Sequence, residues 1–67
     1  MNRDRENRRK DGIKFVYEEL KKGKSFESIY ISEMRNKKYK AGRMAAYLGG
    51  INDGYELYLK FEERHQN

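Results

Sequence analysis

Residues 40–64 of this 67-residue chain read KAGRMAAYLGGINDGYELYLKFEER and carry its clearest apolar pattern. Apolar side chains recur here at alternating spacings of four and three residues, which is typical of an amphipathic helix with a heptad-like seam. The seam consists of Met44, Leu48, Ile51, Tyr55 and Tyr58. We therefore predict one long helix over 40–64 as the organising element of a small all-α domain of two or three helices.

Small residues follow the same helix at intervals of four: Gly42, Ala46, Gly50 and Gly54. A glycine inside a helix costs about 1 kcal/mol relative to alanine, so these glycines need a physical reason. One reason is the close approach of another helix or of a nucleic-acid backbone. The alternative is that Gly49-Gly50 divides the element into helices over 40–48 and 51–64, with Asn52 or Asp53 as a cap. We favour the continuous, glycine-containing helix.

An apolar stripe predicts a first helix over residues 12–22. Its members follow the i, i+3, i+4, i+7 spacing of one helix face: Ile13, Val16, Tyr17 and Leu20. Asp11 is the expected N-cap, and Gly23 is the expected C-terminal stop. We expect this helix to pack on the long one, with Ile13, Val16 and Leu20 against Leu48, Ile51 and Tyr55.

A second helix is predicted over residues 26–36. Ser25 is a good N-cap, and Glu27 in the first turn complements the helix dipole. Residues 28–32 include Ile29-Tyr30-Ile31, which also suits a strand because β-branched and aromatic residues favour the pleated sheet. A single short strand has no evident partner, so we favour the helix.

The composition excludes several function classes. The chain has no cysteine, which excludes a disulfide scaffold, a thiolate zinc site and a cysteine nucleophile. Its one histidine is His65, no serine has a histidine neighbour in the sequence, and no phosphate-binding motif is present. We therefore expect no enzyme, catalytic residue, cofactor, metal or small-molecule substrate. No window approaches the ~18 apolar residues of a membrane helix, so we expect a cytoplasmic protein without a membrane partner.

The positive charge is concentrated in the front two-thirds of the chain. Residues 1–24 carry nine Lys/Arg against five Asp/Glu, residues 25–46 five against two, and residues 47–67 two against four. Residues 1–11 are almost wholly polar and are predicted to form a flexible, disordered basic arm ahead of a helical domain over 12–67. The basic residues of the arm are Arg3, Arg5, Arg8, Arg9 and Lys10.

A second basic cluster, residues 35–43, contains no acidic residue. Uncompensated cations attract phosphates, and an interleaved tyrosine can stack or hydrogen-bond. The candidate contacts are Arg35, Lys37, Lys38, Tyr39, Lys40 and Arg43. The competing explanation for both basic stretches is solubility alone, and the acids of the arm can neutralise its cations. For residues 35–43 we favour a function.

These features predict a small basic nucleic-acid-binding regulator, with DNA or RNA as its partner. The alternative is a protein-binding inhibitor or adaptor, of the kind that phages and mobile elements use, acting through an aromatic C-terminal helix. Tyrosine is enriched at interface hot spots, and a second copy of the chain would cover the seam, so a homodimer is expected. The candidate protein-interface residues are Met44, Tyr47, Tyr55, Tyr58 and Phe61.

Overall fold

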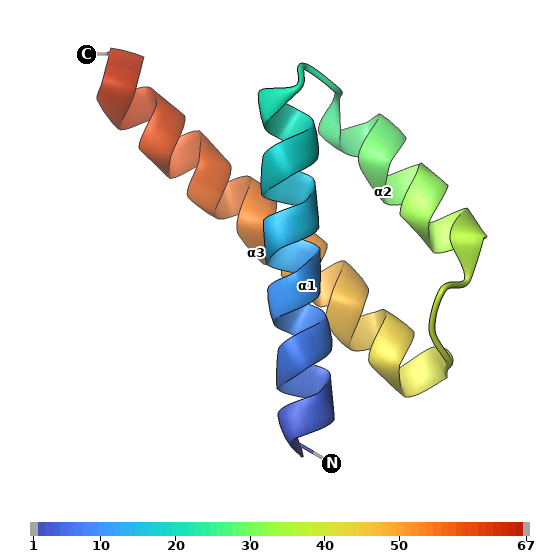
Figure 1. Ribbon diagram of the computed structural model, residues 1–67. Helices are drawn as coiled ribbons and strands as arrows, with labels where there is room; N and C mark the ends of the chain where they lie inside the picture. The colour runs from blue at the N-terminus through green and yellow to red at the C-terminus, as the bar shows by residue number, and fades with distance from the viewer. Residues whose placement is uncertain (1, 67) are drawn as a thin grey trace.

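The computed structural model describes residues 2–66, with the side chains of Asn2 and of residues 63–66 excepted. It contains three helices, α1 (Asn2–Lys21), α2 (Phe26–Asn36) and α3 (Ala41–Gln66), and the predicted all-α class is confirmed (Figure 1). Met1 and Asn67, the ends of the predicted arm and domain, lie outside the described residues. Within the described part of the chain, no helix has the length and apolar character needed to cross a bilayer.

Helix α2 has the bounds that the sequence predicts. The Ser25 hydroxyl accepts a hydrogen bond from the Ser28 backbone N–H at 3.2 Å, which confirms the N-cap. Residues 28–32 lie inside the helix, so the strand alternative is wrong. The helix ends at Lys37, which adopts the left-handed conformation at φ 48°. Gly23, with φ 95°, ends α1 as expected, because glycine adopts this conformation without steric cost.

The prediction of a disordered arm over residues 1–11 is wrong for its described part. Residues 2–11 form the first half of α1, and Asp11 lies inside that helix instead of capping it. Local composition indicates disorder when a segment has too few apolar groups to offset the entropy of ordering. Here the ordering comes from contacts with α3, which the local sequence does not reveal.

Two ion pairs and close backbone contacts hold the first half of α1 on α3. Arg43 donates from Nη2 to Asp4 Oδ2 at 2.6 Å, and Arg9 donates from Nε to Asp53 Oδ2 at 2.7 Å. A Cβ at Gly12 would collide with the backbone oxygen of Tyr47. Exposed ion pairs are individually weak, at about 0–1 kcal/mol, so the close backbone contact is the stronger anchor.

Helix α3 runs without interruption through Gly49-Gly50, which confirms the continuous helix. α1 crosses it at this level (Figure 1). A Cβ at Gly50 would collide with the backbone of Arg9, and one at Gly54 would meet Val16 Cγ1 at 2.5 Å. The reason for these two glycines is therefore the close approach of a helix, and that helix is α1 of the same chain.

The predicted seam of α3 faces inward, and it packs on both other helices. The core consists of Val16, Leu20, Ile29, Tyr47 and Ile51, with Met44, Leu48, Tyr55 and Tyr58 packed against it. The Tyr55 ring stacks on Phe26 with ring centroids 4.2 Å apart. The Tyr58 ring meets the edge of Tyr17 at 5.4 Å. This seam is consequently used within the chain, and it no longer supports the expected homodimer.

A buried hydrogen bond links α3 to α2. The Tyr47 hydroxyl donates to Glu33 Oε1 at 2.6 Å, and both residues are buried. Burial raises the pKa of the Tyr47 hydroxyl, and the hydrogen bond to Glu33 raises it further. The hydroxyl therefore stays protonated and acts as a donor throughout the physiological pH range.

Removing this hydroxyl is expected to destabilise the fold. Tyr47→Phe leaves the buried carboxylate of Glu33 without its donor, which costs about 1–3 kcal/mol. Replacing both partners, in Tyr47→Phe/Glu33→Met, is expected to recover most of that loss because no buried polar group is left unpaired. Urea unfolding followed by circular dichroism measures both variants. A double variant that is less stable than Tyr47→Phe would contradict this interpretation.

Candidate nucleic-acid interface

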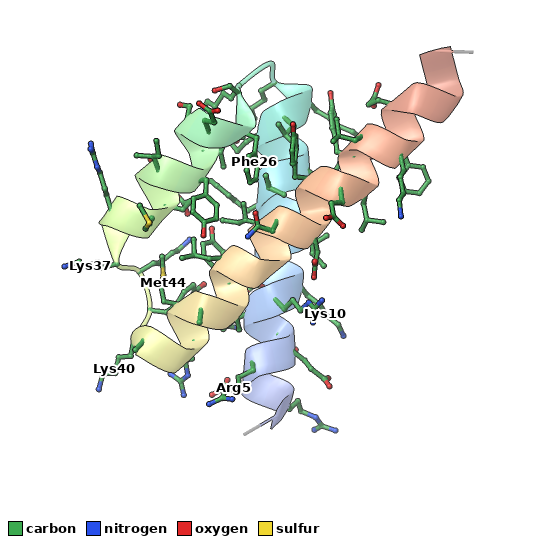
Figure 2. The ribbon with its side chains drawn as sticks, turned by 180° about the vertical axis from the view of Figure 1, so that it is seen from behind. Arg5, Lys10, Phe26, Lys37, Lys40 and Met44 are labelled. Atoms are coloured by element: carbon green, nitrogen blue, oxygen red, sulfur yellow. The ribbon has the colours of Figure 1, made fainter. Side chains whose placement is uncertain are left out.

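The fold brings the two basic stretches together in one open groove. We call it the basic groove; its volume is about 680 Å³, and its lining residues are Asp4, Arg5, Lys38, Tyr39, Lys40, Gly42 and Arg43. Figure 2 shows Arg5 on α1 and Lys40 beside the start of α3 at the same end of the molecule. Arg5 comes from the predicted arm, and the other cations come from the cluster over residues 35–43.

The local structure explains why these cations converge. The left-handed Lys37 ends α2, so the chain turns and presents residues 38–40 before α3 begins at Ala41. Because α1 and α3 cross at Gly12 and Gly50, the first turns of α1 lie beside the first turns of α3. Gly42 lies against Arg5 of α1, since a Cβ on Gly42 would lie 3.6 Å from Arg5 Nη2.

One ion pair lies within the basic groove. Arg43 donates to Asp4 at 2.6 Å, and the two side chains are 55% and 45% exposed. The groove therefore contains four cations and one carboxylate, with Arg43 partly neutralised in the free protein. Asp4 is one of the acids expected to neutralise cations of the arm itself; its partner Arg43 lies 39 positions away, and no local pattern in the sequence indicates this pairing.

Two of the predicted contacts also have structural roles. The Arg8 guanidinium lies 5.1 Å from the centre of the Tyr39 ring. Lys38 Nζ lies 5.9 Å from the Phe15 ring centre and 5.7 Å from that of Tyr47. These cation–π contacts stabilise the packing of the segment between α2 and α3 on the core. Arg8 and Lys38 are therefore less available to a ligand than Lys40 and Arg5.

Six predicted nucleic-acid contacts lie outside the lining of the basic groove, and Arg8, which packs on Tyr39, is one of them. Arg9 is paired with Asp53 and lines a second, smaller groove of about 390 Å³. The other four are exposed cations: Arg3, Lys10, Arg35 and Lys37. Figure 2 shows Lys10 pointing away from the edge where Lys37 and Lys40 lie. The predicted set therefore does not form one surface, and only part of it is brought together.

The predicted protein-interface residues are mostly occupied inside the chain. Tyr47 is 1% exposed, so its assignment to a surface was wrong: its ring belongs to the core. Met44, Tyr55 and Tyr58 are partly buried against that core. Phe61 is 45% exposed, as an interface residue requires.

Two exposed apolar residues of α3, Leu57 and Leu59, were missed as candidates. Leu57 and Phe61 are four positions apart and share a face, whereas Leu59 lies about 200° around the helix from Leu57. The spacing of four residues between Leu57 and Phe61 indicates this shared face in the sequence. The criterion of interface enrichment, which favours tyrosine, does not include leucine.

The basic groove has the chemistry of a polyanion site. Exposed guanidinium groups on α1 and α3, with ammonium groups of the segment that joins α2 to α3, create a local positive potential that attracts phosphates. The first turn of α3 contains no acidic residue, so the positive end of its helix dipole adds to this potential. Comparisons of the chain with protein-family models, with curated proteins and with solved structures found no match.

Proposed function

We propose that this chain is a small non-enzymatic nucleic-acid-binding regulator that contacts phosphates through the basic groove. One observation carries the proposal: Arg5 of α1 and Lys40 and Arg43 at the start of α3, remote in sequence, line the same groove. A solubility function requires only that cations be exposed, and it gives no reason for them to converge. Each phosphate that these cations neutralise releases condensed counterions, which provides a favourable free energy of binding.

Fluorescence anisotropy across a salt series tests the proposal. A labelled duplex of mixed sequence is titrated with the protein between about 50 and 200 mM salt. Contact with three or four phosphates is expected to give a slope of log affinity against log salt of about −3 to −4. The absence of binding over this range, or an affinity that does not depend on salt, would contradict the proposal.

Neutralising Asp4 is expected to strengthen nucleic-acid binding. Asp4→Asn removes the carboxylate that pairs with Arg43 and so frees one cation in the groove. We expect affinity to rise by about three- to tenfold near 0.1 M salt and the salt slope to steepen by about 0.9.

Glu18→Gln is the matched control for Asp4→Asn. It makes the same change in net charge on the exposed surface of α1, about 21 Å along the helix from Asp4. We expect a much smaller effect than that of Asp4→Asn. An equal gain in affinity from both variants would mean that net charge alone, and not the groove, determines binding.

A protein-binding function is the second candidate, and one observation favours it. Leu57 and Phe61 share a face and are 40% and 45% exposed, in the C-terminal half of α3, which diverges from α1 toward the C-terminus (Figure 1). Self-association through this face is the form of protein binding that can be tested with this chain alone. Light scattering over a concentration series would then show a dimer that Leu57→Glu/Phe61→Glu converts to the 8.1 kDa single chain. A wild-type mass of one chain at all concentrations would contradict self-association here.

A further inference from the structure

The aromatic ring that lines the basic groove is already covered by the chain's own side chains. Tyr39 is the aromatic member among the described residues of the lining. The Arg8 guanidinium lies 5.1 Å from its ring centre, and the Tyr47 ring packs against it at 5.2 Å with an interplanar angle of 63°. Tyr39 is accordingly only partly exposed.

The neighbouring rings are occupied in the same way. Lys38 Nζ lies 5.9 Å from the Phe15 ring centre, 6.0 Å from that of Tyr39 and 5.7 Å from that of Tyr47. Phe15 and Tyr47 also pack on each other, with centroids 6.4 Å apart. These aromatic side chains and the two cations therefore form one packed cluster at the back of the groove.

This arrangement decides between two modes of nucleic-acid recognition. Proteins that bind single strands combine a basic track with open aromatic faces on which unstacked bases stack. The Tyr39 ring packs against Arg8 and Tyr47 and is only partly exposed, so it is a poor platform for stacking a base. The exposed charged groups of the groove are cations and the Asp4 carboxylate, and contacts from cations to phosphates carry no sequence information.

The two helices that carry Arg5 and Arg43 are also held in a fixed arrangement. The backbones of α1 and α3 are in contact at Gly12 and Gly50, and the Arg9–Asp53 ion pair links the same two helices. A fixed separation between the backbones that carry Arg5 and Arg43 suits a ligand whose phosphates have fixed positions. A duplex meets this requirement, and it carries a phosphate charge every ~1.7 Å along its axis, whereas one strand carries half that density.

We infer that the basic groove binds the phosphate backbone of a nucleic-acid duplex, without base stacking and without sequence preference. This inference rests on the proposed function and specifies its ligand. Duplex DNA and duplex RNA share the chemistry that the groove recognises, so both serve as probes. Their relative affinities show whether DNA or RNA is the ligand.

The test compares duplexes with single strands by fluorescence anisotropy at about 0.1 M salt. The probes are labelled duplexes of about 20 base pairs in two unrelated sequences, as DNA and as RNA, and an oligothymidine of the same length. We expect at least one type of duplex to bind about tenfold or more tightly than oligothymidine. The two sequences of that type are expected to agree within about twofold, since phosphate contacts carry no sequence information.

A second measurement reports stacking directly. A single strand containing 2-aminopurine loses fluorescence when its bases stack on an aromatic ring, so wild-type protein is expected to leave this signal unchanged.

Three results would overturn the inference. Oligothymidine binding as tightly as the duplexes, or 2-aminopurine quenching by wild-type protein, would show single-strand recognition and leave the proposed function standing. A strong preference for one duplex sequence would show base readout, again with the proposed function intact. Binding of none of the probes at any salt concentration would overturn the proposed function and this inference together.

Discussion

Gly50→Ala is expected to remove about half of the stability of this protein, whereas Gly49→Ala next to it is expected to add stability. A Cβ at Gly50 would collide with the backbone of Arg9, which cannot rotate away as a flexible side chain would. Overpacking of this kind costs about 1–3 kcal/mol or more, and the helix propensity of alanine recovers only about 1 kcal/mol. A net loss of about 2 kcal/mol is large against the roughly 3–5 kcal/mol that so small a core provides.

Gly49 is the matched control because it lies in the same helix and has open space around it. No atom lies within 4 Å of a Cβ at Gly49 beyond the helix's own neighbouring backbone. Gly49→Ala should therefore gain about 0.5–1 kcal/mol from propensity, which raises the melting temperature by roughly 4 °C. Thermal unfolding followed by circular dichroism compares the two variants. Equal stabilisation of both would contradict the close crossing of α1 and α3.

Lys40→Gln/Arg43→Gln is expected to weaken duplex binding by about 30- to 100-fold near 0.1 M salt and to make the salt slope shallower by about 1.8. Both residues line the basic groove, and both are exposed. Each lost phosphate contact removes about 0.9 from the slope. The fold should be retained, since the Asp4–Arg43 pair is exposed and exposed pairs contribute little to stability.

Lys14→Gln/Lys60→Gln is the charge-matched control for this second prediction. Both lysines are exposed, and neither lines the basic groove. The control lowers the net charge by the same amount, so long-range attraction is matched and the groove contacts are retained. We expect it to lose only a few-fold in affinity, about the size of a long-range electrostatic effect. If the two double variants weaken binding equally, the basic groove is not the binding site.

The helices could be predicted from local patterns where the sequence contains local signals. Ser25 and Gly23 mark the limits of α2 and α1 because capping and left-handed turns depend on residues a few positions away. The seam through Ile51 revealed α3 and its buried face, since helical periodicity is visible in sequence. The basic residues of the candidate site could be named for the same reason.

The features that depend on contacts between distant residues could not be predicted. Residues 2–11 contain too few apolar groups to indicate a helix, and they are ordered by α3 through Gly12 and the Arg9–Asp53 pair. Tyr47 resembles an exposed tyrosine in sequence, but its ring packs in the core, where Glu33 accepts the hydrogen bond of its hydroxyl. Arg5 lies beside the cluster over residues 35–43 because α1 and α3 cross at Gly12 and Gly50, a contact between distant residues.

Amide chemical-shift mapping tests the central claim most directly, because it locates the binding surface without any substitution. Unlabelled duplex is added to ¹⁵N-labelled protein, and the shift of each backbone amide is followed. The proposal predicts that the largest shifts occur together at Asp4 and Arg5 of α1 and at residues 38–43, with Gly42 among them. Shifts confined to the exposed end of α3 around Leu57 and Phe61, or the absence of shifts at saturating duplex, would contradict it.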